Sequence, residues 1–492
     1  MNPPGRPALA LSASDIGDAQ ELLVRSCEDC ACPPSGGESE RAEPELDGRP
    51  LVRTPGVLEL PVDAEHVALF SPSGNGGVVV LNTAARAIFD LFTRACSPDR
   101  AMGFTGGDTV LRKLLAHDIV HPLGAPPSQQ LPKSHELTAW LHVTNKCNLR
   151  CPYCYVHKSG ESMDSDTARE SVTALVRSAV DNGFTSLRLK YAGGEASLNA
   201  DVLLGLHEYA VEACTVAGLK LSAVLLSNGV AISRRLAQEL KRLDIRVMIS
   251  LDGIGEAHDA QRPTLTGKPS AARVLTTIDK LCAEGVPPHL SITITSRNVD
   301  AVAEVVRFGL DRDLTFSFNF FRDNDCASAF TDLQYEEQAL LDGLRAAFGE
   351  IERTLPRWSV LGSILDRGQL LRPRSRTCGV GDDYVVIDQR GRIAQCHMEL
   401  EDAAGDIRTT DPVLAVRDPA RKIKNLLVDE KAGCRDCTWK NWCAGGCAVA
   451  TFRATGRFDV RSPNCDIYRT IYPEAVRLEG LRLLAHAGRT PG

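Results

Sequence analysis

The chain has 492 residues, of which 43% are hydrophobic and 24% charged, with a formal net charge of −7. This acidic balance argues against a nucleic-acid partner, which usually meets a basic patch. No apolar run approaches the roughly 20 residues that span a bilayer, and the N-terminal stretch lacks a signal-peptide pattern, so we expect no membrane partner and a cytoplasmic location. The 17 cysteines cluster in short-spaced groups, which favours thiolate ligands in a reducing compartment over disulfides.

Residues 1–50 are rich in proline, glycine, serine and acidic residues, and this composition predicts a disordered tail. The tail contains Cys27, Cys30 and Cys32. Three thiols without a fourth ligand nearby are a weak signal for metal binding, so their role stays open.

Residues 51–125 predict a small domain of strands and helices. Asn82 is placed to cap a helix that carries Ala85, Ile88, Phe89 and Phe92 on one face. The stretch LNTAARAIFDL and the closing DIV resemble PqqD-like peptide-recognition domains. That resemblance implies a winged-helix α+β fold in which a leader peptide adds a strand to an exposed sheet edge. A structural cap is the alternative, and residues 126–136 predict a linker.

Residues 137–330 alternate between strand and helix patterns, with helices expected over 164–182, 200–217 and 271–284. Regular alternation of this kind predicts an α/β fold with a mostly parallel sheet and helices outside it. Several polar candidates stand at the carboxyl ends of strands, where barrel-type folds place their chemistry. Residues 331–370 predict a helical connector.

The stretch CNLRCPYCY, residues 147–155, places three cysteines at C-x3-C-x2-C spacing. Thiolate sulfur suits iron–sulfur clusters and zinc. A structural zinc site takes four protein ligands, and His157 is close enough in sequence to be the fourth. Counting ligands therefore leaves zinc open.

The wider sequence around this motif is similar to the radical S-adenosylmethionine (radical SAM) superfamily. The cysteines follow a first strand with Tyr153 before the last of them, and GGE, SNG, SLDG and HDAQR follow in order. The resemblance implies a partial (β/α)6 TIM-type barrel and a 4Fe–4S cluster on Cys147, Cys151 and Cys154, with SAM at the vacant iron. Arg262 would suit a carboxylate. The implied cofactor contacts are Tyr153, Gly193, Gly194, Glu195, Ser227, Ser250, Asp252 and Arg262.

Residues 371–475 carry the pattern C-x12-G-x4-C, then C-x2-C-x5-C-x3-C, then a last cysteine. A zinc ribbon would explain two short-spaced pairs but not seven cysteines. The whole pattern resembles the SPASM domain, which implies two auxiliary 4Fe–4S clusters. Their expected ligand sets are Cys434, Cys437, Cys443 and Cys465, and Cys378, Cys396 and Cys447. The fourth ligand of the second set would be Cys326 or an exogenous group, and residues 476–492 predict a C-terminal helix and tail.

These resemblances imply a radical SAM oxidoreductase that generates a 5′-deoxyadenosyl radical and takes hydrogen from a ribosomally made precursor peptide with a leader. The product would be a C–C cyclophane, a thioether or a similar modification, with electrons from a flavodoxin- or ferredoxin-type donor. The alternatives are sulfatase-maturase-like oxidation of a protein side chain and a non-catalytic iron–sulfur or zinc scaffold. Sulfatase-maturing relatives carry a catalytic aspartate where this chain has His397, so no catalytic residue is assigned.

Overall fold

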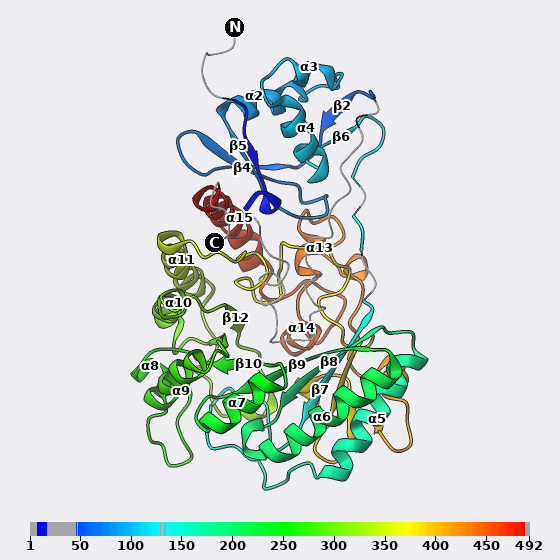
Figure 1. Ribbon diagram of the computed structural model, residues 1–492, viewed down its shortest axis with the longest axis vertical. Coiled ribbons are helices and arrows are strands. Elements are labelled where there is room, and N and C mark those ends of the chain that lie inside the picture. The colour runs from blue at the N-terminus through cyan, green and yellow to red at the C-terminus, as the bar shows by residue number, and fades with distance from the viewer. Residues whose placement is uncertain (1–6, 17–45, 47, 128, 132–133, 488–492) are drawn as a thin grey trace.

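The computed structural model describes residues 7–16, 46, 48–127, 129–131 and 134–487. An N-terminal unit lies at one end of the long axis, an α/β sheet with its helices at the other, and C-terminal segments lie between them (Figure 1). Cys27, Cys30 and Cys32 fall outside the described residues. In the part of the chain that is described, no helix is long and apolar enough to cross a membrane.

In its described residues, the N-terminal unit combines two small antiparallel sheets with three helices. The larger sheet has the order β1-β5-β4-β3, and β2 pairs with β6. The strands of the two sheets are β1 (Ala10–Leu11), β2 (Leu51–Arg53), β3 (Leu58–Pro61), β4 (His66–Phe70), β5 (Val79–Asn82) and β6 (Val120–Pro122). Its helices are α2 (Thr83–Leu91), α3 (Asp99–Met102) and α4 (Gly107–Ala116).

The predicted helix cap at Asn82 is confirmed. Asn82 Oδ1 accepts a hydrogen bond from the Ala85 N–H at 2.9 Å, which satisfies one of the free donors at the start of α2. The four apolar residues expected on one face of this helix are all buried, because that face packs into the core of the N-terminal unit.

The predicted disorder of residues 1–50 is wrong for one stretch. Residues 10 and 11 form β1 on the edge of β5, and a 3-10 turn (Ala13–Ile16) follows. Ala10 and Leu11 are buried. The composition of the whole segment hid a short apolar run, ALAL, that gains hydrogen-bond partners and apolar contacts by covering a sheet edge.

The central sheet has nine strands in the order β12-β11-β10-β9-β8-β7-β13-β14-β15. The stretch from β7 to β12 pairs in parallel and in chain order, as the alternating sequence pattern predicts. These strands are β7 (Glu136–His142), β8 (Ser186–Ala192), β9 (Lys220–Ser227), β10 (Ile245–Ser250), β11 (His289–Ile294) and β12 (Phe316–Phe320). The connecting helices are α5 (Ser165–Asp181), α6 (Ala200–Ala217), α7 (Arg234–Arg242), α8 (Glu256–Gln261), α9 (Ala271–Ala283) and α10 (Val302–Leu310).

The sheet continues beyond β7 with strands from the C-terminal third of the chain. β13 (Tyr384–Ile387) pairs in parallel with β7, and β14 (Arg392–Ala394) and β15 (Ala403–Asp406) follow as antiparallel strands. Val386 of β13 pairs with both Trp140 of β7 and Ala394 of β14, so the end of β14 lies level with the middle of β7. Cys396 and His397 follow directly in the loop after β14.

The remaining helices surround these strands: α11 (Glu337–Thr354), α12 (Pro412–Arg417), α13 (Lys440–Cys443), α14 (Ala448–Thr455) and α15 (Cys465–His486). The last of them is one continuous helix, so it crosses the boundary that the sequence predicted between residues 475 and 476. Its apolar residues lie in the core shared with the sheet, and this packing continues the helix past the expected limit.

The N-terminal unit packs against the C-terminal segments through aromatic and close backbone contacts. The Phe70 ring lies 5.8 Å from the Trp439 ring and 5.0 Å from the Trp442 ring, centroid to centroid. Trp442 Nε1 donates to the Pro72 carbonyl at 2.9 Å. A Cβ atom on Gly480 of α15 would lie 2.9 Å from the Ala68 Cβ, so the helix approaches β4 closely.

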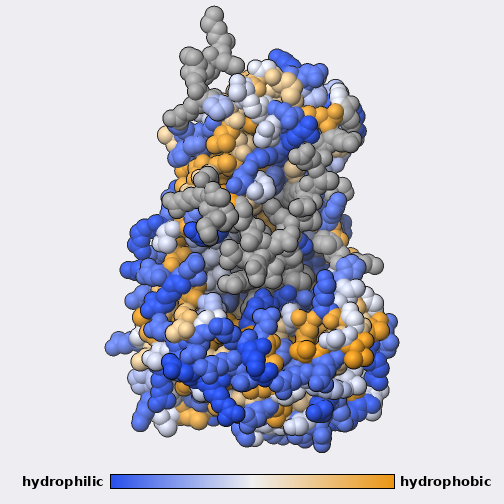
Figure 2. All heavy atoms as spheres, viewed as in Figure 1, coloured by the Kyte–Doolittle hydropathy of each residue, from blue (hydrophilic) through white to orange (hydrophobic). Residues whose placement is uncertain are grey.

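Hydrophilic residues cover most of the face shown in Figure 2, and hydrophobic residues gather near α5. Exposed apolar side chains of α5 and α6 include Val180, Val211 and Val216. Single exposed apolar residues are normal on protein surfaces, so we attach no function to this area.

Candidate functional site

The loop after β7 and the loop after β8 lie against each other. The Gly194 N–H donates to the Thr144 carbonyl at 2.7 Å, and the Glu195 N–H donates to the Lys146 carbonyl at 2.8 Å. A Cβ atom on Gly193 would lie 2.4 Å from the Thr144 oxygen, and one on Gly194 would lie 2.4 Å from the Lys146 oxygen. Only glycine fits at these two positions, and it allows the cysteine loop to rest on the end of β8.

Three thiols gather in this loop. Burial is the largest cause that raises the pKa of Cys151 to about 12, and the Cys154 and Cys147 sulfurs contribute to the rise. The Leu149 N–H donates to Cys147 Sγ at 3.4 Å, and Asn228 Nδ2 lies 3.8 Å from the same sulfur. Buried thiolates need a positive partner to stay ionised. Three soft sulfur donors with N–H groups beside them fit an iron–sulfur cluster.

The Glu195 carboxylate joins the ends of β8 and β9. It accepts hydrogen bonds from Ser227 Oγ at 2.7 Å, Ser197 Oγ at 2.6 Å and the Asn228 N–H at 2.7 Å. Glu195 is buried, so these donors satisfy a charge that burial would otherwise disfavour. The carboxylate thereby holds the SNG turn beside the cysteine loop.

Asp252 lies behind the site rather than in its wall. Arg262 Nε donates to Asp252 Oδ2 at 2.6 Å, the Tyr153 hydroxyl donates to the same carboxylate, and the Thr293 N–H donates to Oδ1 at 2.8 Å. Asp252 is completely buried. The sequence predicted Asp252 as a direct cofactor contact and Arg262 as a grip for a ligand carboxylate. The structure pairs Arg262 with Asp252, because a buried guanidinium needs a counter-charge. Asp252 does not line the cavity, whereas Arg262 does.

A cavity of about 230 Å³ opens beside the three thiols. Seven of the eight predicted cofactor contacts line it, all except Asp252. The opposite wall is formed by the end of β12, the connector of residues 331–370 and the loop after β14. It contains Phe320, Phe321, Arg322, Arg367, His397 and Met398. The cavity therefore has a cysteine wall and a wall that includes two arginines.

The other two predicted cysteine sets also come together. Burial raises the pKa of Cys434 to about 11, and the sulfurs of Cys443, Cys465 and Cys437 contribute. In the second set, burial raises the pKa of the Cys396 thiol, and the sulfurs of Cys447 and Cys378 contribute. The sulfurs that raise these two pKa values belong to the same two groups that the SPASM resemblance implies, and the ligand sets themselves stay a prediction. Across the described residues, no three histidine, cysteine or acidic side chains form a site for a single metal ion.

A tight loop links these two sets between Cys443 and Cys447. Ala444, Gly445 and Gly446 all have positive φ values of 48°, 76° and 72°. The Thr377 hydroxyl lies 2.7 Å from the Gly446 carbonyl, to which it donates. The resulting left-handed turn directs neighbouring cysteines toward different sets.

Cys326 does not join the set of Cys378, Cys396 and Cys447 in the contacts that the structure shows. Its Sγ lies 3.4 Å from the Tyr155 carbonyl, to which it donates. Burial raises the pKa of Cys326, and the sulfur of Cys154 contributes. The suggestion that Cys326 supplies the fourth ligand of that set is therefore not supported, because the chain around Cys326 packs on the first cysteine loop.

His397 forms part of the cavity wall and is held on two sides. Its ring stacks on Trp140 with centroids 4.4 Å apart, and its Nδ1 lies 2.8 Å from the Tyr384 hydroxyl. Burial lowers the pKa of His397, and the positive charges of Arg367 and Arg322 lower it further. The imidazole is therefore neutral, which makes it a fixed aromatic and hydrogen-bonding surface.

The cavity residues that sequence reasoning missed include three polar ones, Lys158, Asn228 and Arg367. Burial by itself would lower the pKa of Lys158, but the Cys154 sulfur raises it overall, so the ammonium offers the cysteine loop a positive charge. Asn228 lies beside the Cys147 sulfur, and Arg367 is buried in the far wall. The asparagine stands inside the SNG motif and could have been singled out, whereas the other two have no local sequence signal.

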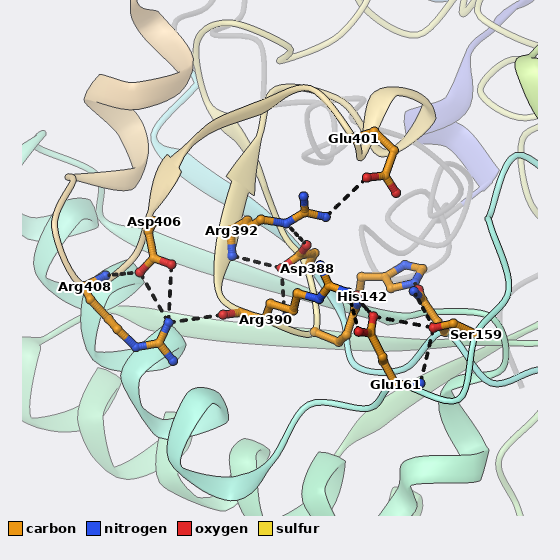
Figure 3. Close-up of polar contacts among 11 residues, drawn as sticks. His142, Ser159, Glu161, Asp388, Arg390, Arg392, Glu401, Asp406 and Arg408 are labelled. Atoms are coloured by element: carbon orange, nitrogen blue, oxygen red, sulfur yellow. Dashed lines mark hydrogen bonds and ion pairs between the residues drawn. The ribbon is translucent and has the colours of Figure 1, made fainter.

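Polar contacts tie the cysteine loop to the hairpin of β13 and β14 (Figure 3). Glu161, which follows the cysteines, accepts from Gln389 Nε2 at 2.9 Å and forms an ion pair with Arg390. Within the hairpin, Arg392 Nε donates to Asp388 Oδ2 at 2.6 Å. The first cysteine loop and the loop of Cys396 are therefore held in one polar network as well as in one sheet.

Residues 141–309 match the model of the Radical SAM superfamily. An uncharacterised protein of Methanocaldococcus jannaschii is 31% identical over 169 residues, which cover 34% of this chain and 56% of the relative. The PqqA peptide cyclase of Bradyrhizobium diazoefficiens is 23% identical over 363 residues, covering 69% of this chain and 90% of the relative. The solved structure of anSMEcpe with bound AdoMet and the Cp18Cys peptide aligns with a TM-score of 0.56 at 19% identity, covering 72% and 99% of the two chains.

Some relatives are matched over only part of their length. The chain spans 56% of the archaeal relative, and 38% of the sporulation killing factor maturation protein SkfB of Bacillus subtilis, to which it is 29% identical over 171 residues. Residues 141–309 hold the cysteine triad, the GGE and SNG turns and most of the cysteine wall of the cavity. This chain therefore carries a domain of the radical SAM superfamily.

Proposed function

We propose that this protein is a radical SAM enzyme that modifies a ribosomally made precursor peptide. The observation that carries the proposal is the single cavity bounded by the Cys147, Cys151 and Cys154 loop on one side and by the loop after Cys396 on the other. A relative named PqqA peptide cyclase aligns over most of both chains, and the structurally similar anSMEcpe holds AdoMet with a peptide.

The first cysteine triad would hold a 4Fe–4S cluster, and its residues fit that group. Its three thiols leave one iron without a protein ligand, and the turns that carry Gly194 and Ser227 border the adjacent space. When bound, the cluster and SAM supply a 5′-deoxyadenosyl radical that takes hydrogen from the substrate. The chain orients the cofactor through the glycine backbone and through Arg262, which Asp252 holds in place.

The remaining seven cysteines would hold two auxiliary clusters. Cys434, Cys437, Cys443 and Cys465 provide four thiolates, enough to close one cluster. Cys378, Cys396 and Cys447 provide three, and the fourth position would be open to substrate or an exogenous ligand. His397 and Arg367 lie beside this second set and line the cavity, so they would face the substrate.

The N-terminal unit would recognise the peptide as a winged-helix, PqqD-like domain. Its contacts with α13 and α15 fix it next to the SPASM-like region. The barrel-type arrangement of β7–β12 would be the partial (β/α)6 barrel of the superfamily, and reducing electrons would come from a flavodoxin or ferredoxin. The bond formed would be a C–C or thioether cross-link.

Anaerobic reconstitution tests the proposal. The wild-type chain should hold about twelve irons, four per cluster, and should convert SAM to 5′-deoxyadenosine in the presence of reductant. Cys151→Ala should lose about four irons and all cleavage while it keeps the auxiliary clusters. Stoichiometric zinc without cleavage would instead favour the scaffold alternative.

A further inference from the structure

Within residues 7–16, β1 (Ala10–Leu11) lies as an added strand on the edge of the larger N-terminal sheet, and the 3-10 turn Ala13–Ile16 follows it (Figure 1). β1 runs antiparallel to β5, with Ala10 opposite Leu81 and Leu11 opposite Val80. The segment also contacts α4, which lies beside the same edge. An extended stretch of chain thus lies along the β5 edge, next to a helix.

The backbone of this segment is held mainly by Asn82 at the end of β5 and by Thr105 before α4. Asn82 accepts the Leu9 N–H on its Oδ1 at 3.1 Å, donates its own N–H to the Leu9 carbonyl at 3.2 Å, and donates Nδ2 to the Pro7 carbonyl at 3.0 Å. The Ala8 N–H donates to the Thr105 carbonyl at 3.0 Å. Because these contacts read the backbone, a different peptide could make them equally well.

Three further contacts hold the segment, and two of them involve its side chains, those of Leu11 and Asp15. Leu11 is buried in the main core. A Cβ atom on Gly106 would lie 2.8 Å from the Ala8 carbonyl oxygen, so a side chain at position 106 would push the segment away. Lys113 Nζ donates to the Ala10 carbonyl at 2.8 Å and forms an ion pair with Asp15. The contacts of Leu11 and Asp15 therefore favour a peptide with a leucine followed four positions later by an acidic residue.

We propose that the β5 edge beside α4 is a peptide-binding site which residues 7–16 fill from within the same chain. An extended peptide would compete for this edge if it carried a small apolar residue, a leucine directly after it, and an acidic residue four positions after the leucine. The occupying strand is only two residues long, well below the usual five or six, so a longer competing strand would gain more ladder hydrogen bonds. That the competitor is the leader of the modified peptide rests on the proposed function, whereas the binding site does not.

Binding in trans tests the site. A fluorescent peptide of residues 5–18, GRPALALSASDIGD, is titrated against the full chain and against a chain that lacks residues 1–16, and anisotropy is measured. We expect the truncated chain to bind at least tenfold more tightly. Two peptides provide the matched comparison: Leu11→Asp should abolish binding, and Leu9→Asp should leave it unchanged, because Leu9 is 42% exposed. Equal binding to both chains, or no binding to a folded truncated chain, would overturn the proposal.

A second measurement decides the matter if the truncated chain does not fold. Hydrogen exchange of residues 79–82 is compared in full-length Leu11→Asp and Leu9→Asp chains. Exchange should be faster in the first variant and unchanged in the second, and equal rates in the two would contradict the proposal. Neither measurement depends on catalysis. A chain that binds the peptide but never cleaves SAM would refute the proposed function alone.

Discussion

Asp252→Asn removes the charge that holds Arg262 without changing the size of the side chain. Asp252 is fully buried and accepts from the guanidinium at 2.6 Å, from the Tyr153 hydroxyl and from the Thr293 N–H at 2.8 Å. The Arg262 side chain is only 9% exposed, so water cannot replace the lost carboxylate. Breaking a buried pair in this way typically costs about 3–5 kcal/mol.

Thermal unfolding of the cluster-free chain measures this cost. In a unit of 150–250 residues, 1 kcal/mol shifts the melting temperature by about 2–4 °C, so Asp252→Asn should lower it by about 6–20 °C. Asp332→Asn is the matched control. It removes a charge that pairs with Arg297 at 2.7 Å, but the Asp332 side chain is 62% exposed. Exposed pairs contribute about 0–1 kcal/mol, which corresponds to less than about 4 °C. Equal shifts in the two variants would refute the reasoning.

Three more changes test separate parts of the site. Gly194→Ala should prevent assembly of the first cluster, because its Cβ would meet backbone atoms, and the measurement is about four fewer irons per chain. Gly205→Ala in α6 is the control: its Cβ would have nothing within 4 Å, so this variant should keep full iron. Iron loss in both variants would contradict the prediction. Burial raises the pKa of Asp383 to about 6, so the folded state binds the proton more tightly and stability falls as pH rises from about 4 to about 6. Asp383→Asn should therefore raise the melting temperature at about pH 7.5 and leave it unchanged near pH 4; a shift of the same size at both would count against a titration effect. Cys434→Ala should lose about four irons. Cys282→Ala is the control and should lose none. Iron loss in Cys282→Ala alone would reject the ligand assignment.

Local patterns explain which parts of this fold the sequence predicted. Alternating strands and helices, the cap at Asn82 and the grouping of the cysteines depend on residues that are close in sequence or on a recognisable spacing. The glycines of the GGE motif were also identified, although the physical reason for them, a carbonyl 2.4 Å from each absent Cβ, comes only from the structure.

Long-range pairing explains what was missed. The pairing of β13 with β7 joins segments more than 240 residues apart, and no periodicity reports such a contact. Asp252 was predicted as a cofactor contact from the resemblance of SLDG to a superfamily motif, but in the structure its carboxylate accepts a hydrogen bond from Arg262 and does not line the cavity. The strand of residues 10 and 11 was lost in a segment judged by its average composition.

The parallel pairing of β13 with β7 also bears on how this protein could be divided. A chain that ended before residue 384 would leave the N–H and C=O groups of β7 along that side without their ladder partners. A bare edge of this kind, rich in leucine and tryptophan, invites pairing with other chains. The C-terminal third therefore completes the central sheet and cannot be removed without exposing β7. Exchanging it between homologues would require keeping the pairing of β13 with residues Thr138 to Leu141 of β7.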